Sequence, residues 1–244
     1  MIPRTLRGFF AAINDLLFPP LCLGCKRRLE SSQPPLFCPH CAKALVFIRS
    51  PLCSRCGIPF VSGNDHLCGA CLTDRHAFDL ARSLCIYRPP LADLILALKF
   101  HGHMAGIATF STLLARSNLF DAFCEPDIIL PVPLHARRLR ERGFNQAQTI
   151  AAGCFAHWKK RIALNLLIRH RSTTPQSLLS GKERRQNLHD VFSLVDPGRV
   201  SGAQVLLVDD VYTTGSTVNA CSKVLRQAGA KRIEVFTLAR SLAG

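Results

Sequence analysis

The stretch VLLVDDVYTTGST, from Val205 to Thr217, carries the clearest indication of fold in the chain. Its first four residues are apolar, and two carboxylates and a turn of small hydroxyl residues follow. A continuous apolar run without alternation is typical of a strand buried on both faces, as in a parallel sheet with helices above and below. We expect a helix after the turn, because apolar residues recur at spacings of three and four from Val218 to Ala228. Ser216 or Thr217 can cap its start, and Gly229 marks its end.

The two acids and the turn are expected to meet a ligand, because ligands bind at the carboxyl ends of the strands in an α/β sheet. Backbone N–H groups at a helix N-terminus and the turn hydroxyls suit a phosphate monoester. Asp209 and Asp210 would repel that phosphate, so they make sense if they accept hydrogen bonds from neutral hydroxyls or hold a divalent cation. A sugar phosphate meets both demands, whereas an acidic loop that only caps a helix needs one acceptor. The other common phosphate loop, Gly-x-x-x-x-Gly-Lys-Ser/Thr, does not occur in the chain.

The same stretch resembles the phosphoribosyl pyrophosphate (PRPP) loop of type I phosphoribosyltransferases. In that loop, a hydrophobic strand leads into two acids and a Thr-Thr-Gly-x-Thr turn. The resemblance implies that Asp209 and Asp210 contact the ribose hydroxyls and that PRPP binds together with Mg²⁺. It also implies that the 5′-phosphate is held by the turn residues Thr213, Thr214, Gly215, Ser216 and Thr217.

Eight of the twelve cysteines form four Cys-x-x-Cys pairs. Such pairs suit a tetrahedral zinc site, because each two-residue spacer turns the chain so that both thiolates face one ion; a disulfide framework does not need them. Redox Cys-x-x-Cys motifs normally occur singly, at the N-terminus of one helix. Spacers of 12 and 11 residues therefore predict two zinc ribbons with one structural ion each, held by Cys22, Cys25, Cys38 and Cys41, and by Cys53, Cys56, Cys68 and Cys71. The remaining cysteines are expected to be buried small hydrophobes: Cys85, Cys124, Cys154 and Cys221.

The chain is strongly basic, with a formal net charge of +15. Eight thiolates with two Zn²⁺ would add −8 + 4 = −4 and leave about +11. Such a charge suits a polyanionic partner or an anionic substrate. The longest apolar stretches contain a charge or stop short of the roughly 18 residues that a membrane span requires, so no span is expected.

Changes of composition divide the chain into three parts. Residues 1–21 fit an amphipathic helix, which either packs against a later domain or lies on a membrane surface; polar residues interrupt the apolar run that a signal peptide needs. Residues 22–77 hold the double zinc ribbon, and residues 78–244 alternate strand and helix patterns, which predicts an α/β fold with a parallel sheet flanked by helices. The predicted strands lie at residues 83–87, 127–132, 191–195, 204–208 and 233–238, and helices lie at 91–98, 105–116 and 144–158.

Two basic stretches lie near the expected ligand edge. PVPLHARRLRERGFNQA, from Pro131 to Ala147, opens at the end of a predicted strand. A solvated helix face is the ordinary explanation of such a run, but its place beside the turn makes its arginines candidates for binding nucleic acid: Arg137, Arg138, Arg140 and Arg142. The stretch from Arg169 to Phe192 is long, basic and broken by turn residues, as a lid or binding loop is. Type I phosphoribosyltransferases close such a loop over PRPP, so the resemblance suggests three cations for neutralising departing pyrophosphate: Lys182, Arg184 and Arg185.

These segments together resemble the ComF family of competence-associated proteins from end to end. The shared pattern comprises a short helix, paired Cys-x-x-Cys elements, KF-x-G, PVPLH...R-x-R-x-RGFNQ, R...T-x-x-Q...R-x-x-N...F and the PRPP loop. The resemblance implies a cytoplasmic protein that handles incoming single-stranded DNA in natural transformation or in DNA utilisation. It further implies a competence helicase and recombination-loading proteins as partners.

Two other functions stay open at the level of the residues. An active type I phosphoribosyltransferase of nucleotide metabolism would place metal and cations on the leaving group, although the sequence identifies no acceptor pocket. A PRPP-sensing regulator would need a DNA-reading motif, and no helix-turn-helix is recognisable. The DNA-binding hypothesis depends mainly on charge, because aromatic residues make up 7% of the chain with a single Trp, which leaves few platforms for base stacking.

Overall fold

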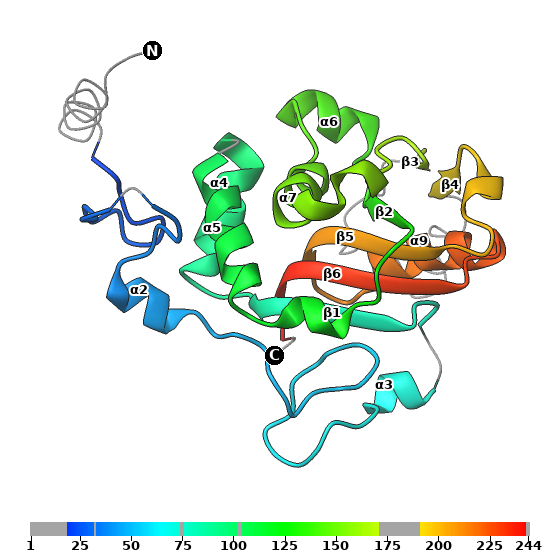
Figure 1. Ribbon diagram of the computed structural model, residues 1–244, viewed down its shortest axis with the longest axis horizontal. Coiled ribbons are helices and arrows are strands. Elements are labelled where there is room, and N and C mark those ends of the chain that lie inside the picture. The colour runs from blue at the N-terminus through cyan, green and yellow to red at the C-terminus, as the bar shows by residue number, and fades with distance from the viewer. Residues whose placement is uncertain (1–18, 32, 74–75, 102–103, 171–190, 243–244) are drawn as a thin grey trace, which may run out of the picture.

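The core of the protein is a four-stranded sheet in the order β1-β6-β5-β2, in which every pair of neighbouring strands is parallel. The computed structural model describes residues 19–31, 33–73, 76–101, 104–170 and 191–242. Figure 1 shows the sheet, whose strands are β1 (Leu80–Ile86), β2 (Ile128–Pro131), β5 (Gln204–Tyr212) and β6 (Arg232–Arg240). The predicted α/β class with a parallel sheet is confirmed.

Helices cover both faces of the sheet, as the unbroken apolar run in β5 predicted. Leu206 and Val208 belong to one core cluster and Val205 and Leu207 to another, and all four are at most 2% exposed. Alternate residues of a strand point to opposite faces, so β5 is buried from both sides. The covering helices are α4 (Leu91–His101), α5 (Met104–Ala115) and α7 (Gln146–Cys154) in the first cluster and α9 (Ser216–Gln227) in the second.

The start of α9 differs from its prediction. Ser216 or Thr217 was the expected cap, but the N-cap is Gly215, whose φ of +74° is left-handed. The hydroxyl of Thr214 accepts a bond from the N–H of Ser216 at 3.4 Å instead. Glycine adopts this backbone conformation without steric cost, so the helix can begin directly after it, at Ser216. Gly229, at φ +83°, follows the last turn of α9 as expected.

The strand predicted at residues 191–195 does not join the parallel sheet. β4 (Phe192–Leu194) pairs antiparallel with β3 (Leu167–Arg169), a strand that the sequence pattern did not reveal. The pair is held partly by the guanidinium of Arg169, which lies 5.5 Å from the centre of the Phe192 ring. β4 packs beside α9, so this small ribbon extends the second face of the domain.

The helix predicted at residues 144–158 is divided in two. α7 ends at Cys154, and the 3-10 turn η2 (Ala156–Arg161) follows it across a break at Phe155, whose φ of −116° is not helical. A further helix, α6 (Ala136–Arg142), occupies the basic stretch after β2. Its N-cap is His135, whose ring accepts a bond from the N–H of Arg137.

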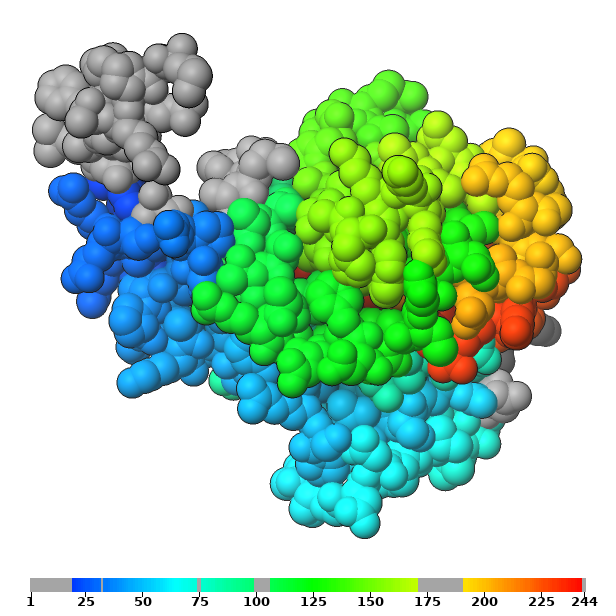
Figure 2. All heavy atoms as spheres, in the orientation of Figure 1, coloured from blue at the N-terminus to red at the C-terminus, as the bar shows by residue number. Residues whose placement is uncertain are grey.

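The cysteine-rich segment covers the free edge of β1. Its short helices are α2 (Pro39–Ala44) and α3 (Gly69–Leu72), and the chain between them runs along the strand. The N–H of Ile48 donates to the carbonyl of Leu84 at 3.1 Å, and the N–H of Ile86 donates to Val46 at 2.8 Å. In Figure 2 the segment forms a blue-to-cyan layer along one side of the molecule. An exposed sheet edge is thereby protected.

Three of the four cysteines outside the Cys-x-x-Cys pairs are buried as expected, but Cys124 is exposed. It lies in the loop between η1 (Leu119–Ala122) and β2, and its N–H donates to Glu234 at 2.9 Å. Because this loop runs over the surface, the apolar character of the neighbouring sequence did not bury the thiol.

No helix within the described ranges has the length and apolar character needed to cross a membrane. The amphipathic helix predicted at residues 1–21 lies outside the described part of the chain, apart from residues 19–21.

Candidate functional site

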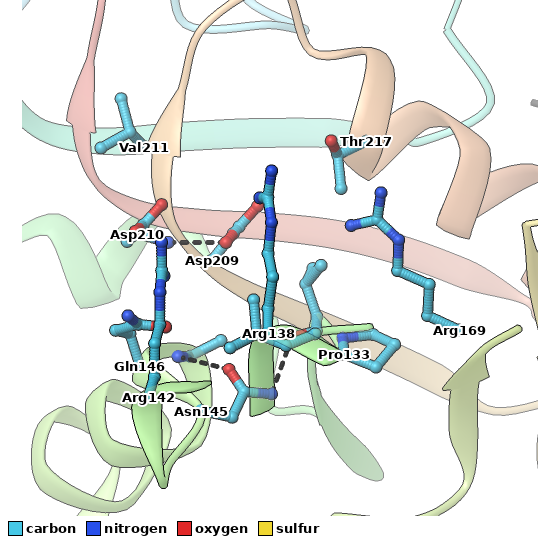
Figure 3. Close-up of a pocket in the computed structure, with 13 residues that line it drawn as sticks. Pro133, Arg138, Arg142, Asn145, Gln146, Arg169, Asp209, Asp210, Val211 and Thr217 are labelled. Atoms are coloured by element: carbon cyan, nitrogen blue, oxygen red, sulfur yellow. Dashed lines mark hydrogen bonds between the residues drawn. The ribbon is translucent and has the colours of Figure 1, made fainter. Parts of the chain in front are cut away.

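A pocket of about 170 Å³, here called the sheet-end pocket, opens at the carboxyl ends of β2 and β5 (Figure 3). Its walls come from the loop after β2, from α6, the start of α7, β3, the end of β5 and the start of α9. Ligands of α/β proteins bind at this end of the sheet. The polar side chains that line it belong to Arg138, Arg142, Asn145, Gln146, Arg169, Asp209, Asp210 and Thr217.

Asp209 and Asp210 enter the sheet-end pocket from β5, which continues past them to Tyr212. Both are partly exposed. The Oδ1 of Asp209 accepts a bond from the N–H of Asp210 at 2.9 Å, drawn as a dashed line in Figure 3. This bond orients the first carboxylate. Two carboxylates in one pocket can accept bonds from hydroxyl groups or bind a divalent cation.

Three guanidinium groups share the sheet-end pocket with the two acids (Figure 3). Arg138 and Arg142 are four residues apart on α6 and so lie on one side of that helix. Arg169 comes from the end of β3. Burial lowers the pKa of Arg169, and the positive charge of Arg138 lowers it further. Cations held this close together favour an anionic ligand between them.

The other two arginines predicted on this stretch point elsewhere. Arg137 is exposed and its Nε pairs with Glu141 at 2.9 Å. Arg140 is exposed and is not among the residues that line the sheet-end pocket. The predicted nucleic-acid set is thus divided between the pocket and the outer surface of α6. The candidate lid cations Lys182, Arg184 and Arg185 lie outside the described residues.

The turn at residues 213–217, here called the phosphate loop, depends on Gly215. A Cβ atom at this position would lie 2.2 Å from the Tyr212 hydroxyl, and the backbone is left-handed, so glycine alone fits. The hydroxyls of Thr214 and Ser216 are 2.8 Å apart. Thr217, in the first turn of α9, lines the sheet-end pocket, whereas the other four predicted loop residues do not. Backbone N–H groups at the start of α9 suit a phosphate at this place.

Three polar residues of the sheet-end pocket were missed by the sequence analysis: Arg169, Asn145 and Gln146. Asn145 caps α7: its Oδ1 accepts from the N–H of Ala147 and its Nδ2 donates to the carbonyl of Val132, each at 3.0 Å. Gln146 is 2% exposed, and its Nε2 has no hydrogen-bond partner among the described residues. A buried amide donor without a partner is costly, which suggests that a ligand supplies the acceptor. Asn145 and Gln146 belong to the RGFNQ motif, which directly follows the run of arginines and could have indicated them.

The eight paired cysteines form two clusters in the predicted sets. The sulfur atoms of each cluster lie within 4.8 Å of one another. Sγ–Sγ distances of 3.7 Å separate Cys25 from Cys38 and Cys56 from Cys68. Zn–S bonds of about 2.3 Å in a tetrahedron place sulfur atoms about 3.8 Å apart, so the donor sets fit Zn²⁺. The two four-cysteine sites are consistent with two structural zinc ions.

Backbone N–H groups stabilise the thiolate form of one cysteine in each cluster. Burial raises the pKa of Cys22, but backbone hydrogen bonds from Cys25, Cys38 and Gly24 outweigh it and lower the pKa to about 6. Cys53 behaves in the same way, with a pKa lowered to about 6 against the effect of burial. Because the thiolate is the form that binds metal, these sulfur atoms are available as ligands at neutral pH.

The fold and the two kinds of site define a class: a phosphoribosyltransferase-type α/β domain joined to a double zinc ribbon. Two family models agree. The double zinc ribbon domain matches residues 13–72, and the phosphoribosyl transferase domain matches residues 161–244.

Similar proteins narrow the class to a family. The DNA utilization protein YhgH of Salmonella typhi is 36% identical over 93% of this chain and 100% of its own length. Competence protein F of Haemophilus influenzae is 35% identical over 90% of this chain and 96% of its own. Competence protein ComFC of Streptococcus pneumoniae is 28% identical over 65% and 67%. The chain belongs to the ComF family of competence and DNA utilization proteins.

Proposed function

We propose that this protein handles incoming single-stranded DNA in natural transformation or DNA utilisation and that its phosphoribosyltransferase-like domain binds PRPP with Mg²⁺. The main support is the sheet-end pocket, which combines two carboxylates with three guanidinium groups beside the phosphate loop. A ligand that carries both hydroxyls and several phosphates satisfies this mixture of charges. The DNA role is supported by the names of the relatives and by the charge of about +11 that would remain after zinc binding.

In this proposal each part of PRPP has its own contacts. Asp209 and Asp210 accept hydrogen bonds from the ribose hydroxyls. Backbone N–H groups and hydroxyls of the phosphate loop hold the 5′-phosphate. The pyrophosphate lies against the guanidinium groups of Arg138, Arg142 and Arg169, which can donate paired hydrogen bonds to phosphate oxygens. Asp209 and Asp210 would also supply carboxylate oxygens to Mg²⁺, which prefers oxygen ligands and substrate phosphates.

An active phosphoribosyltransferase is the second candidate, because the phosphoribosyl transferase family model matches residues 161–244. Catalysis would then require cations on the departing pyrophosphate, for which Lys182, Arg184 and Arg185 are the proposed residues. Incubation with labelled PRPP separates the two candidates. A new labelled ribosyl product would establish transfer, whereas unchanged PRPP that is nevertheless bound would favour a binding role.

Replacing Gln146 with Leu is expected to weaken PRPP binding about 5- to 10-fold without lowering the melting temperature. The substitution removes a buried donor that lacks a partner in the described structure, so the free protein loses no hydrogen bond, while the complex does. Calorimetry with PRPP and Mg²⁺, together with thermal unfolding, tests both halves. A clearly lower melting temperature would mean that the amide has a structural partner.

Salt dependence should show which arginines meet DNA. Arg137→Ala with Arg140→Ala should flatten the log-log salt slope for a labelled single-stranded oligonucleotide by about 1.4, since each phosphate contact contributes about 0.7. Both residues lie on the exposed side of α6, away from the sheet-end pocket. PRPP affinity should therefore be unchanged.

The matched control is Arg138→Ala with Arg142→Ala, which removes the same charge from the same helix but from inside the sheet-end pocket. This pair should lose PRPP affinity while keeping most of the salt slope. If Arg137→Ala with Arg140→Ala has the same salt slope as the wild type, DNA binds at a surface other than α6. Zinc content should be the same in all variants.

A further inference from the structure

Arg240, the last residue of β6, connects the second four-cysteine site to the end of β5. Its side chain is buried, with 6% of the residue exposed. Nη1 donates to the carbonyl of Cys56 at 2.7 Å, and Nη2 lies 3.8 Å from the Cys56 sulfur. The guanidinium also lies over the ring of Tyr212, 4.2 Å from its centre. One buried cation therefore contacts a metal ligand and an aromatic ring at the same time.

Tyr212 carries the connection to the phosphate loop. It is the last residue of β5, is 3% exposed, and pairs in register with Arg240. Its hydroxyl lies so close beneath Gly215 that a Cβ atom there would be 2.2 Å away. The ring thus supports the backbone of the phosphate loop at its left-handed residue. A shift of the ring would remove this support, while the carbonyl of Gly215 still accepts a bond from the N–H of Asn219 at 2.9 Å on the helix side.

The charge of Arg240 explains why the metal matters. No carboxylate of the described residues forms an ion pair with it. The anionic group that it contacts is the Cys56 sulfur, and four thiolates around one Zn²⁺ carry a net charge of about −2. With zinc bound, the buried guanidinium has a counter-ion. Without zinc the four sulfur atoms are no longer tied to one ion, so the Cys56 carbonyl and sulfur that Arg240 contacts can move, which favours a rearrangement.

The first four-cysteine site has no such link among the described residues. Its neighbours are α4 and α5: the N–H of Leu36 donates to the hydroxyl of Thr109 at 3.1 Å, and Gly24 packs against Pro90. Cys22 and Cys41 of that site belong to the core cluster on the face of the sheet that α4 and α5 cover, whereas Cys56 and Tyr212 belong to the other cluster. The two metal sites therefore differ in what they can influence.

We propose that zinc in the second four-cysteine site holds the phosphate loop in its binding conformation through Arg240 and Tyr212, so that affinity for a ribose 5-phosphate group depends on that zinc. Arg240 is a positioning residue in this scheme and touches no ligand. The proposal rests on the proposed PRPP site for its ligand, but the structural link itself does not.

The first test measures affinity. Arg240→Met should weaken PRPP binding about tenfold in calorimetry with Mg²⁺, within the range of about 5- to 150-fold that coupling between sites usually gives. Arg82→Met is the matched control: it removes a guanidinium of β1 that also reaches the second four-cysteine site, where it donates to the carbonyls of Cys53 and Ser54. The control should stay within about twofold of the wild type. Equal affinity of both variants and the wild type would overturn the proposal.

A second variant separates the two halves of the link. Tyr212→Leu leaves the bonds from Arg240 to Cys56 in place but removes the ring under Gly215. Tyr212→Leu should weaken PRPP binding, but a chelator should remove zinc from it at the wild-type rate. Arg240→Met should weaken PRPP binding and also release one of the two zinc ions to the chelator faster than the wild type does. Faster zinc release from Tyr212→Leu would contradict this order of contacts.

Amide hydrogen exchange of the full chain provides a measurement that does not need the ligand. Exchange at residues 213–217 should accelerate when zinc is removed and also in zinc-loaded Arg240→Met, compared with Arg82→Met. If the wild type binds no PRPP, the proposed function is wrong. The exchange rates still test whether zinc, Arg240 and Tyr212 hold the phosphate loop. Identical exchange in zinc-loaded Arg240→Met and the wild type would overturn it.

Discussion

Chelation of the metal is expected to unfold the cysteine-rich segment, residues 22–77, while the parallel sheet stays folded. Structural zinc contributes about 10 to 16 kcal/mol of binding free energy per site at neutral pH, which is as large as the total stability of a typical domain, about 5 to 15 kcal/mol. The segment has little regular structure of its own: its helices α2 and α3 span 6 and 4 residues. The sheet has its own buried core on both faces.

The sheet should nevertheless become less stable after chelation. The chain at residues 46–48 covers the edge of β1 through backbone hydrogen bonds, and Phe37 and Leu45 belong to the core cluster under α4 and α5. Losing the segment uncovers both. A lower melting temperature of the remaining domain is therefore expected, and the exposed β1 edge should promote aggregation.

Metal analysis and proteolysis test this expectation. The purified protein should contain two zinc ions per chain, and Cys25→Ser and Cys68→Ser should each lose one, because the two cysteines belong to different clusters. Protease treatment after chelation should leave a resistant fragment that begins near residue 78. A single zinc, or iron in its place, would contradict the pairing. A product that is unfolded throughout would show that the proposed boundary is wrong.

Local sequence patterns predicted those parts of the molecule whose structure is determined by residues close together in the chain. The apolar run in β5 predicted burial on both faces, and the Cys-x-x-Cys spacing predicted which cysteines gather in each cluster; the burial and the two clusters were confirmed. β3 was missed because three residues are too few to show a period, and its partner β4 lies beyond a long basic stretch. That partner strand in turn packs against α9, so the pair depends on tertiary contacts.

The sheet-end pocket was harder to predict because long-range packing builds it. Arg169 enters it only because β3 lies beside the start of α9 and the loop after β2. Gln146 was not predicted because the arginine-rich stretch before it was the more conspicuous feature of the sequence. The division of the α6 arginines could have been predicted, since residues 138 and 142 share a helical side and residue 137 pairs with residue 141 on another.

The second large effect is expected at the acid pair. Asp209→Ala with Asp210→Ala should weaken PRPP binding by about 2 to 6 kcal/mol, because two hydrogen-bonded contacts to the ribose hydroxyls would be lost at about 1 to 3 kcal/mol each. That corresponds to at least about 30-fold in affinity. The Mg²⁺ requirement should change as well, since the acids are also the nearest oxygen ligands that the sheet-end pocket offers.

Asparagine variants separate the charge of the acids from their shape. Asp209→Asn keeps an oxygen that can accept the bond from the N–H of Asp210, so the end of β5 should stay ordered. If the acids serve the ribose hydroxyls alone, the asparagine variants should retain more affinity than the alanine variants; if they hold Mg²⁺, both should lose it alike, because an amide oxygen is a weaker ligand than a carboxylate. Calorimetry at fixed Mg²⁺ distinguishes the two. Full affinity in the double alanine variant would leave the acid pair without a role in ligand binding, and PRPP would then have to be held by the three guanidinium groups of the pocket and the phosphate loop without the acids.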